Sequence, residues 1–515
     1  MFSSSQIGFL FGVMNPNERL IRGTTRHHRL SQLGPFEPAR RGESCAPCAP
    51  FEASEIRFER EDMELVYRRC CGIDIHKKTI VACLITETES GQRHKELRTF
   101  RTVTSELLVL LDWLKAAACT HVAMESTGVY WKPIYNILEG HFELLVVNAQ
   151  HIKAVPGRKT DVRDAEWIAD LLQHGLLKGS YIPPAPQREL RELTRYRVSL
   201  VQERARAVNR LQKTLEDTNL KLGDVATDIM GKSARAMLEA LLAGQTDPGK
   251  LADLARGRLK AKRAQLEEAL VGTVKPHHRF MLSEQLVLID TLDEAIERVS
   301  QEIALRLDPP PDPQEGEPEH QAESNQQAEA AQAGASAQEP EPEQKKPGLS
   351  WKEAVAFLDS IPGINQRAAE GILAEIGIDM SRFPTAGHLA SWAGMCPGNN
   401  ESAGKRLSGK TRKGSPWLRK LLVEAAHAAA HAKNTYLSAF YHRIKARGGG
   451  KQAMIAVGHA ILVAIYYMLS RNLSYQEVGG NYFDEHDRQA VEKRLVRRLE
   501  KLGYQVSLEP ATQVA

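Results

Sequence analysis

A tract that is too polar to fold divides the chain. Residues 308–347 contain eight prolines, ten acidic residues, two lysines and almost no large apolar side chain. Such a composition cannot bury enough apolar surface to offset the entropy of ordering the chain. The sequence of 515 residues is also too long for one hydrophobic core. We therefore expect two or more compact regions and a flexible linker over residues 308–348.

The charge balance is distinctly basic once this linker is set aside. The whole chain has a formal net charge of +4, of which the tract contributes −8, so the remainder carries +12. A basic surface favours a polyanionic partner such as nucleic acid.

Cysteine usage and apolar segments are typical of a protein of the reducing cytoplasm. Seven cysteines, two of them adjacent at Cys70 and Cys71, do not resemble a disulfide framework. Cys45 and Cys48 have no second pair of ligands nearby at zinc spacing, so we expect no metal there. The apolar run from Ala453 contains Gly458 and lies among basic segments, which predicts a buried core helix and no membrane partner.

The first compact region is expected to be an α/β domain over residues 70–180. Residues 1–69 have no sustained periodicity and predict a variable or disordered extension. Three β-rich segments follow, with a turn near His76 to Lys78, and then helices alternate with short strands. This order predicts a mixed sheet with helices on its faces.

The chain beyond this domain is expected to be helical. Residues 186–307 predict a coiled coil or long helical hairpin, because apolar residues recur at helical spacing in two segments. The positions are Leu193, Leu200, Val201, Val208, Leu211 and Leu215 in the first segment, and Leu282, Ile289, Ile296 and Ile303, with Leu292 and Val299, in the second. The arginines between them fit a phosphate-tracking arm and a solvated face equally well. A second compact region at 349–480 and a tail at 481–515 complete the chain.

Four acidic residues of the first domain are candidate metal ligands. Asp161 and Asp164 lie three residues apart in the first turn of a helix expected at 157–175, where acids complement the helix dipole or converge on a hard cation. Asp74 is expected at the buried centre of the first strand, where a charge is costly without a metal or partner. Glu125 closes a later strand, at the edge where open mixed sheets present side chains to a crevice.

These four positions are those of the carboxylates in the RNase H-like fold. Two divalent ions about 4 Å apart can there assist phosphodiester cleavage. The segment GIDIHKKTI also suggests the first phosphate loop of actin-like sugar kinases and ATPases. We disfavour that alternative, because His76, Lys77 and Lys78 fill the turn and glycine-rich phosphate loops are missing downstream.

The second compact region carries motifs for binding nucleic acid. An Ile-Pro-Gly-Ile turn at 361–364 between two helical segments predicts a helix-hairpin-helix-like element. A basic segment without acids follows from Ser402 to Lys420, and glycines and serines are expected to keep it open to a phosphate backbone. Its basic residues are Lys405, Arg406, Lys410, Arg412, Lys413, Arg419 and Lys420. His427 and His431 lack a third zinc ligand, so we favour packing or a phosphate contact for them.

At this point the chain resembles the DEDD transposases of the insertion-sequence one-hundred-and-ten family, in particular its eleven-eleven subgroup. The resemblance rests on GIDIHKK, MESTGVYW, KTDVRDA, IPGI, CPGNNESAGKR and KGSPWLRKLLVEAA, which occur in the family order between about Cys71 and Leu469. It implies a RuvC-like nuclease domain whose Asp74, Glu125, Asp161 and Asp164 bind Mg²⁺ or Mn²⁺. It also implies a C-terminal transposase domain in which Ser402 attacks DNA as a nucleophile.

The resemblance further implies the partners. Members of the family act on DNA as homo-oligomers, dimers or tetramers, and use a structured noncoding guide RNA. This sequence departs from the family pattern in its long leading segment, its expanded linker and Ser415, which stands where asparagine is common. Ser408 and Ser415 therefore remain alternative nucleophiles.

Two other functions remain open from the sequence. The first is a RuvC-like endonuclease that cuts DNA junctions by hydrolysis, and the second is a non-catalytic nucleic-acid-binding protein.

Overall fold

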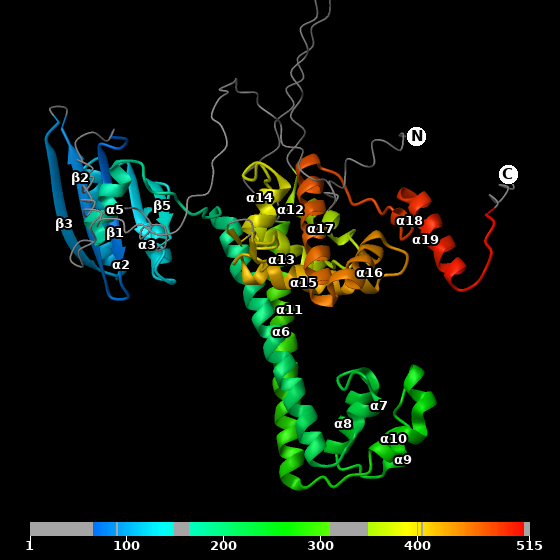
Figure 1. The fold of residues 1–515 in the computed structure, drawn as a ribbon. Coiled ribbons are helices and arrows are strands. Elements are labelled where there is room, and N and C mark those ends of the chain that lie inside the picture. The colour runs from blue at the N-terminus through cyan, green and yellow to red at the C-terminus, as the bar shows by residue number, and fades with distance from the viewer. Residues whose placement is uncertain are drawn as a thin grey trace, which may run out of the picture. The chain divides into compact units, whose positions relative to one another are not determined.

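The computed structural model describes residues 65–88, 91–148, 164–308, 349–398, 400–402 and 405–508. The chain divides into two compact units between Pro183 and Pro184 (Figure 1). Cys45 and Cys48, like most of the predicted extension and linker, lie outside the described residues. The domain limits expected from the sequence stay predictions.

The N-terminal unit is built on a five-stranded mixed sheet with the order β3-β2-β1-β4-β5. The strands are β1 (Arg69–Ile75), β2 (Thr79–Glu87), β3 (Arg93–Arg101), β4 (His121–Glu125) and β5 (Glu143–Val147). The first three pair antiparallel, whereas β4 is parallel to both β1 and β5. The expected turn lies between β1 and β2, and the predicted mixed sheet is confirmed.

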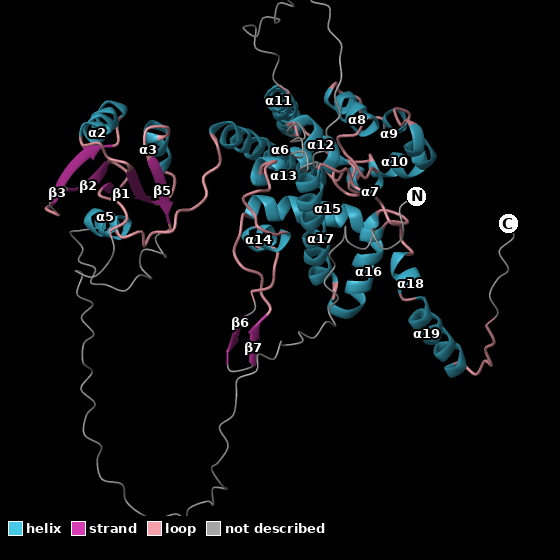
Figure 2. Cartoon of the chain, turned by 90° about the horizontal axis from the view of Figure 1, so that it is seen from above, coloured by secondary structure: helices cyan, strands magenta, loops and turns pink. Residues whose placement is uncertain are grey.

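Helices cover both faces of this sheet (Figure 2). The helices α2 (Thr104–Ala116) and α3 (Trp131–Leu138) pack on one face, and α5 (Asp164–Gln173) packs on the other. Alternate residues of a strand point to opposite faces. Cys71 and Ile73 of β1 therefore join the core under α2 and α3, while Cys70 joins the core under α5. Burial on both faces explains why β1 is apolar along most of its length.

The second unit begins with an antiparallel pair of long helices, α6 (Ala185–Asp217) and α11 (Pro276–Leu307). The start of α6 meets the end of α11, since Leu190 shares a core with Ile303. The other ends meet through Leu211 and Leu282. The predicted helical hairpin is therefore present, and supercoiling of the pair stays a prediction.

The packing stripes of this hairpin agree with the sequence pattern at most positions. Leu282, Ile289, Ile296 and Ile303 of α11 are all buried. Val201 of α6 is exposed, contrary to its place in the predicted stripe. It follows Leu200 by about 100° around the helix, so both side chains cannot face α11.

A small helical insertion connects the two long helices. It consists of α7 (Leu222–Val225), α8 (Lys232–Leu242), α9 (Pro248–Ala252), the 3₁₀ helix η2 (Gly257–Lys262) and α10 (Arg263–Ala269). Its buried residues, such as Met237 and Leu266, form one core with the neighbouring ends of α6 and α11.

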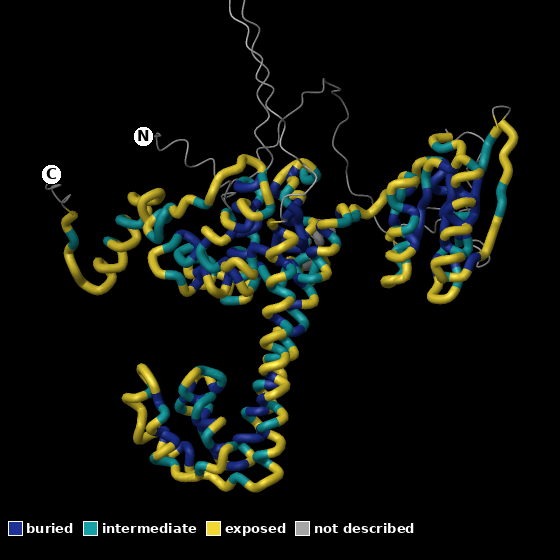
Figure 3. The backbone as a smooth tube through the Cα atoms, turned by 180° about the vertical axis from the view of Figure 1, so that it is seen from behind, coloured by how far each residue is buried: buried dark blue, intermediate teal, exposed yellow. Residues whose placement is uncertain are grey.

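The remaining elements form a helical bundle at the base of the hairpin. They are α12 (Trp351–Asp359), α13 (Gln366–Ile376), α14 (Ala386–Trp392), β6 (Asn400–Ser402), β7 (Lys405–Ser408), α15 (Pro416–His431), α16 (Tyr436–Gly448), α17 (Gly450–Arg471), α18 (Tyr482–His486) and α19 (Arg488–Lys501). Leu190 and Ile303 belong to the bundle core, so the hairpin and the bundle share one interior (Figure 3).

The apolar helix α17 lies within this core. Among the described residues it is the one helix long and apolar enough to cross a bilayer. Val457, Ile461 and Ile465 are fully buried against the bundle, which confirms the prediction of a core helix.

The Ile-Pro-Gly-Ile turn joins α12 to α13 and packs tightly on α15. Gly363 has a φ of +93°, and a Cβ added there would lie 2.5 Å from the Ala425 carbonyl oxygen. Only glycine fits such a position. The helix-hairpin-helix assignment itself stays a prediction.

Candidate active site

Asp74 lies at the carboxyl end of β1. It is the penultimate residue of the strand and not its centre, and its side chain is 17% exposed. The expectation of a buried strand centre was therefore wrong, because β1 ends at Ile75 and the turn to β2 follows directly. His76 Nε2 lies 3.3 Å from Asp74 Oδ2. Successive side chains of a strand point to opposite faces of the sheet. Asp74 therefore lies on the same face as Cys70 and Gly72, which is the face that α5 covers.

Glu125 is the neighbour of Asp74 on the adjacent strand. The parallel register pairs Ile73 with Met124, and Asp74 and Glu125 each follow by one residue. Paired residues of neighbouring strands point to the same face, about 4.8 Å apart along the hydrogen-bonding direction. Glu125 is the last residue of β4, as the sequence predicted. Two carboxylates therefore share one edge and one face of the sheet.

The helix α5 brings Asp164 to the same edge. A Cβ on Gly72 would lie 2.5 Å from the Ala165 carbonyl oxygen and 2.3 Å from the Ala169 nitrogen, so α5 crosses β1 at Gly72. Further back along β1, the Cys70 Sγ lies 3.8 Å from the Ala169 carbonyl oxygen. The helix therefore runs against the strand direction, and its first residue, Asp164, lies toward the carboxyl end of β1.

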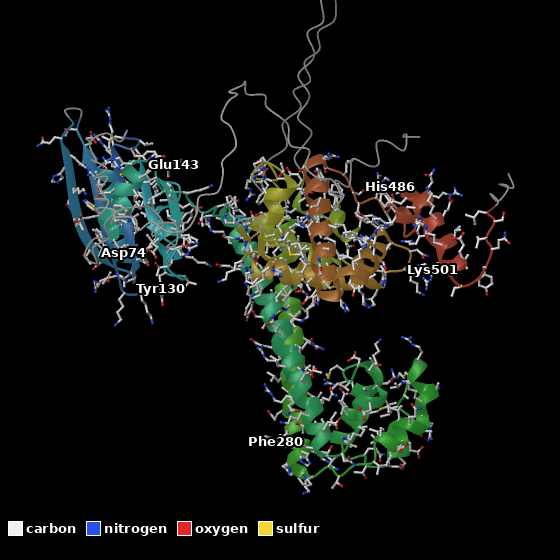
Figure 4. The ribbon with its side chains drawn as sticks, in the orientation of Figure 1. Asp74, Tyr130, Glu143, Phe280, His486 and Lys501 are labelled. Atoms are coloured by element: carbon white, nitrogen blue, oxygen red, sulfur yellow. The ribbon has the colours of Figure 1, made fainter. Side chains whose placement is uncertain are left out.

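Figure 4 shows which end of the unit this is. Asp74 and Tyr130 lie at the end opposite to Glu143, the first residue of β5. Tyr130 follows β4 by five residues and is 38% exposed, and its neighbour Val129 is 65% exposed. The carboxylate edge therefore has an exposed apolar rim.

The donor chemistry at this edge suits a divalent cation. Carboxylate oxygens are the ligands that Mg²⁺ and Mn²⁺ prefer. Asp161, the fourth predicted ligand, lies outside the described residues. Within the part of the chain that the structure describes, no group of three or more His, Cys, Asp or Glu side chains is close enough to hold a metal ion. Asp74, Glu125 and Asp164 suit a divalent cation because all three are carboxylates at the same edge of the sheet, on the side that α5 covers. The complete ligand set stays a prediction.

The candidate nucleophile Ser402 lies on a short β-hairpin of the second unit. Residues 400–402 and 405–408 are described by their backbone alone, and the antiparallel register pairs Ser402 with Lys405 and Glu401 with Arg406. The sequence analysis did not predict these two strands, which satisfy one another's backbone groups. That the segment is open to a phosphate backbone stays a prediction. Ser408 lies opposite Asn400.

The residues after the hairpin divide into exposed and anchored side chains. Lys410 and Lys413 are exposed, and so are most of the residues from 409 to 414. Arg419 is anchored, because its Nη1 donates to the Thr411 Oγ1 at 2.7 Å and to the Gly394 carbonyl at 3.2 Å. Arg419 thus ties the segment that carries the hairpin to α14 and α15, and its predicted contact with nucleic acid remains a prediction.

Ser415 caps α15 at the foot of this segment. Its Oγ accepts a hydrogen bond from the Leu418 backbone at 3.3 Å and donates to Glu375 Oε2 at 3.0 Å. Both interactions are structural, and they favour a capping role over a nucleophilic role for Ser415.

Buried ion pairs attach α6 to the bundle beneath Ser415. Glu375 of α13 is 4% exposed and accepts from Arg195 Nε at 2.7 Å and Nη2 at 3.0 Å. The Arg191 Nη2 donates to the Glu375 carbonyl at 2.7 Å. One turn earlier on α13, Arg197 Nη1 lies 2.6 Å from Glu370 Oε2, and both side chains are buried. Paired charges of this kind are costly to break.

His427 and His431 lie next to each other on the surface of α15, with their rings tilted by 41°. Their ring centroids lie 4.7 Å apart, and the His431 Nδ1 lies 2.8 Å from the His427 carbonyl oxygen. Each side chain is exposed, and a role in packing or phosphate contact stays a prediction.

Comparison with known proteins identifies both regions. Residues 71–220 match the family model of DEDD transposases of IS110 type, described as transposase, and residues 355–442 match that described as the transposase IS116/IS110/IS902 family. Two regions of the chain are thus similar to transposase domains of IS110 type. The first matched region contains Asp74, Glu125 and α5, and the second contains the β6–β7 hairpin and α15.

A relative from a known insertion element supports the same assignment. The chain is 32% identical over 122 residues to the insertion element IS110 uncharacterized 43.6 kDa protein of Streptomyces coelicolor. This match covers 23% of the chain and 29% of the relative, so the chain spans less than a third of that protein.

Sequence reasoning missed several residues that hold the elements of these two matched regions in place. Gly72 seats α5 on β1, and the signal was a glycine inside an otherwise apolar strand, which often marks a close backbone approach. Glu370 and Glu375 bind arginines of α6. Their signal was two acids in the otherwise apolar segment 368–376 of α13, and no pattern indicated their partners about 180 residues away.

Proposed function

We propose that this protein is the transposase of an insertion sequence, a site-specific recombinase that cleaves and exchanges DNA strands in the bacterial cytoplasm. The observation that carries the proposal is the adjacent register of Asp74 and Glu125 at the edge to which α5 brings Asp164. Two transposase domains in one chain support it.

The first domain would hold Mg²⁺ or Mn²⁺ through Asp74, Glu125, Asp161 and Asp164. A bound divalent cation supplies charge neutralisation at the scissile phosphate and activates the attacking oxygen. The chain's own contribution is to fix the ligands. β1 and β4 hold Asp74 and Glu125 side by side, and the close contact at Gly72 sets the position of α5.

The second domain would supply the nucleophile. The Ser402 Oγ attacks phosphorus and forms a phosphoserine ester, while one ester bond of the DNA strand breaks. The proton that leaves Ser402 is transferred to the departing DNA oxygen, so charge and atoms balance. Lys405 and Arg406 on the facing strand would offset negative charge that develops on the phosphate.

The finer features of the proposal follow from the resemblance to the eleven-eleven subgroup. The protein would act as a homo-oligomer, a dimer or tetramer, on element ends and target DNA, and a structured noncoding RNA would guide it. Lys405, Arg406, Lys410, Arg412 and Lys413 would contact the nucleic acid backbone, because they share an acid-free segment beside the hairpin.

One experiment separates strand transfer from hydrolysis. Full-length protein is purified with its co-purifying RNA and assayed for DNA cleavage with and without Mg²⁺, as wild type, Asp161→Asn and Ser402→Ala. We expect both variants to lose strand transfer and Ser402→Ala to lose the denaturation-resistant DNA adduct. Cleavage that persists in Ser402→Ala would assign the acids to a hydrolytic RuvC-like endonuclease instead. Unchanged activity in Asp161→Asn would remove the metal site from the proposal.

A further inference from the structure

The C-terminal helix α19 follows α18, which packs on the bundle of the second unit. Phe483 of α18 stacks on Tyr436 and Tyr482 meets it edge to face, with ring centroids 5.2 Å away in both cases. Asp487, between the two helices, lies 3.6 Å from Arg443 of α16. None of the residues of α19 itself is buried. The N-terminal end of α19 is thus held at the bundle. The helix extends away from the bundle between the labelled residues His486 and Lys501 (Figure 4).

The helix α19 has one continuous basic face. At about 100° per residue, five cations fall within a sector of about 140° that contains no acid. They are Lys493, Arg494, Arg497, Arg498 and Lys501, and together with Ala490 and Glu500 they line one hollow of the surface. Glu500 lies at the margin of the sector. Glu492 lies on the other side and pairs with Arg488 at 2.9 Å.

The spacing of these cations suits a phosphate backbone. Arg494, Arg497 and Lys501 follow one another at three and four residues, so they span about 10 Å along the helix axis. Phosphates of one duplex strand advance by about 3.4 Å per nucleotide, so the row reaches about three of them. Arginine is also suited to bidentate contacts with phosphate oxygens.

We propose that the basic face of α19, defined by Lys493, Arg494, Arg497, Arg498 and Lys501, binds the phosphate backbone of a nucleic acid duplex. This site lies outside both transposase matches, which end at residues 220 and 442. This inference rests on the proposed function only for the choice of nucleic acid as the class of ligand. The site gives the protein a second nucleic-acid contact, separate from the segment around the β6–β7 hairpin.

Charge complementarity selects this ligand over two others. A second copy of the same face would bring five cations against five cations, which repel. Insertion into a membrane would also bury the opposite face, where Leu495 and Leu499 are exposed. The Arg488–Glu492 pair lies in that sector beside Leu499, and its burial in lipid would be costly.

The test measures binding of full-length protein to a DNA duplex and an RNA duplex of one sequence, each over a range of salt concentrations. The basic-face variant carries Arg494→Gln, Arg497→Gln and Lys501→Gln. The matched control carries Arg235→Gln, Arg263→Gln and Arg306→Gln, which removes three charges that already pair with acids. A third variant, Arg494→Lys, Arg497→Lys and Lys501→Arg, keeps the charge.

The salt dependence gives the decisive reading. The slope of log K against log salt is negative, and each lost phosphate contact reduces its magnitude by about 0.9 for B-DNA. We therefore expect the magnitude to fall by about 2.7 in the basic-face variant. Affinity should fall at least tenfold at low salt, while the control and the charge-preserving variant keep the wild-type slope. A loss with DNA alone or RNA alone identifies which duplex the helix binds.

Other outcomes would overturn the proposal. They are an unchanged slope on both duplexes, an equal loss in the control, or a change only in the binding of anionic lipid vesicles or in oligomer mass. Failure of the proposed recombinase is a separate result, since it would remove the Ser402 adduct and leave the salt slope of α19 as it is.

Discussion

The close packing of α5 on β1 at Gly72 predicts that the substitution Gly72→Ala displaces the helix. The added Cβ would lie 2.3 Å from the Ala169 nitrogen and 2.5 Å from the Ala165 carbonyl oxygen, and both are backbone atoms. An ordinary contact needs about 3.4 Å, so α5 must retreat by about 1 Å. Overpacking of this kind costs about 1–3 kcal/mol of stability. Because Asp164 begins α5, the retreat also moves a proposed metal ligand away from Asp74.

The expected effect on activity is larger than the effect on stability. A misplacement of about 1 Å in a reacting group can lower a rate about 100-fold. We therefore expect Gly72→Ala to stay folded at 25 °C and to lose about 100-fold in Mg²⁺-dependent strand cleavage. Thermal unfolding of the full-length protein and initial cleavage rates at saturating Mg²⁺ measure the two quantities.

A matched glycine provides the control. A Cβ at Gly179 would meet the Leu145 side chain at 3.6 Å, which is an ordinary contact, so Gly179→Ala should change neither quantity. Wild-type stability in Gly72→Ala would refute the close approach of α5 to β1. Reduced stability with wild-type cleavage would instead show that the reaction does not depend on where α5 begins.

Three further predictions concern the second unit. Glu370→Gln leaves Arg197 buried without a counter-charge and should destabilise the unit by about 3–5 kcal/mol. Calorimetry should show this loss as a lower unfolding temperature. An unchanged unfolding temperature would contradict the buried ion pair. Ser415→Ala removes the cap of α15 and the bond to Glu375, and should cost about 1–2 kcal/mol while the DNA adduct persists. An adduct lost at undiminished stability would make Ser415 the nucleophile. Burial lowers the pKa of His459 in the folded protein below its ordinary value of 6.5. The unfolded chain therefore binds a proton at this imidazole more tightly than the folded protein does. Stability consequently falls as the pH drops from 6.5 toward the pKa of the folded protein. The unfolding temperature of wild type should therefore fall more between about pH 7.5 and 5.5 than that of His459→Gln, and equal falls would argue against this role.

The sequence alone determined the main elements of the fold and indicated the residues of the candidate site. Hydrophobic periodicity predicted the mixed sheet, the helical hairpin and the core helix from Ala453, because local pattern decides which face of a segment is apolar. The strand-end position of Glu125 also followed from local pattern. The four acids and Ser402 were selected partly by their residue types and partly by motifs shared with a transposase family.

The tertiary structure decided which of these residues meet. The register of β1 on β4 places Asp74 beside Glu125, and this register depends on how two strands about 50 residues apart pair. The direction of α5 follows from its contacts with Gly72 and Cys70, and local pattern marks a close approach at Gly72 without indicating its partner. The partners of Glu370 and Glu375 lie on α6, beyond the reach of any periodicity. Local sequence fixes what a segment can form, whereas long-range packing fixes what its side chains touch, because those contacts depend on segments far apart in the chain.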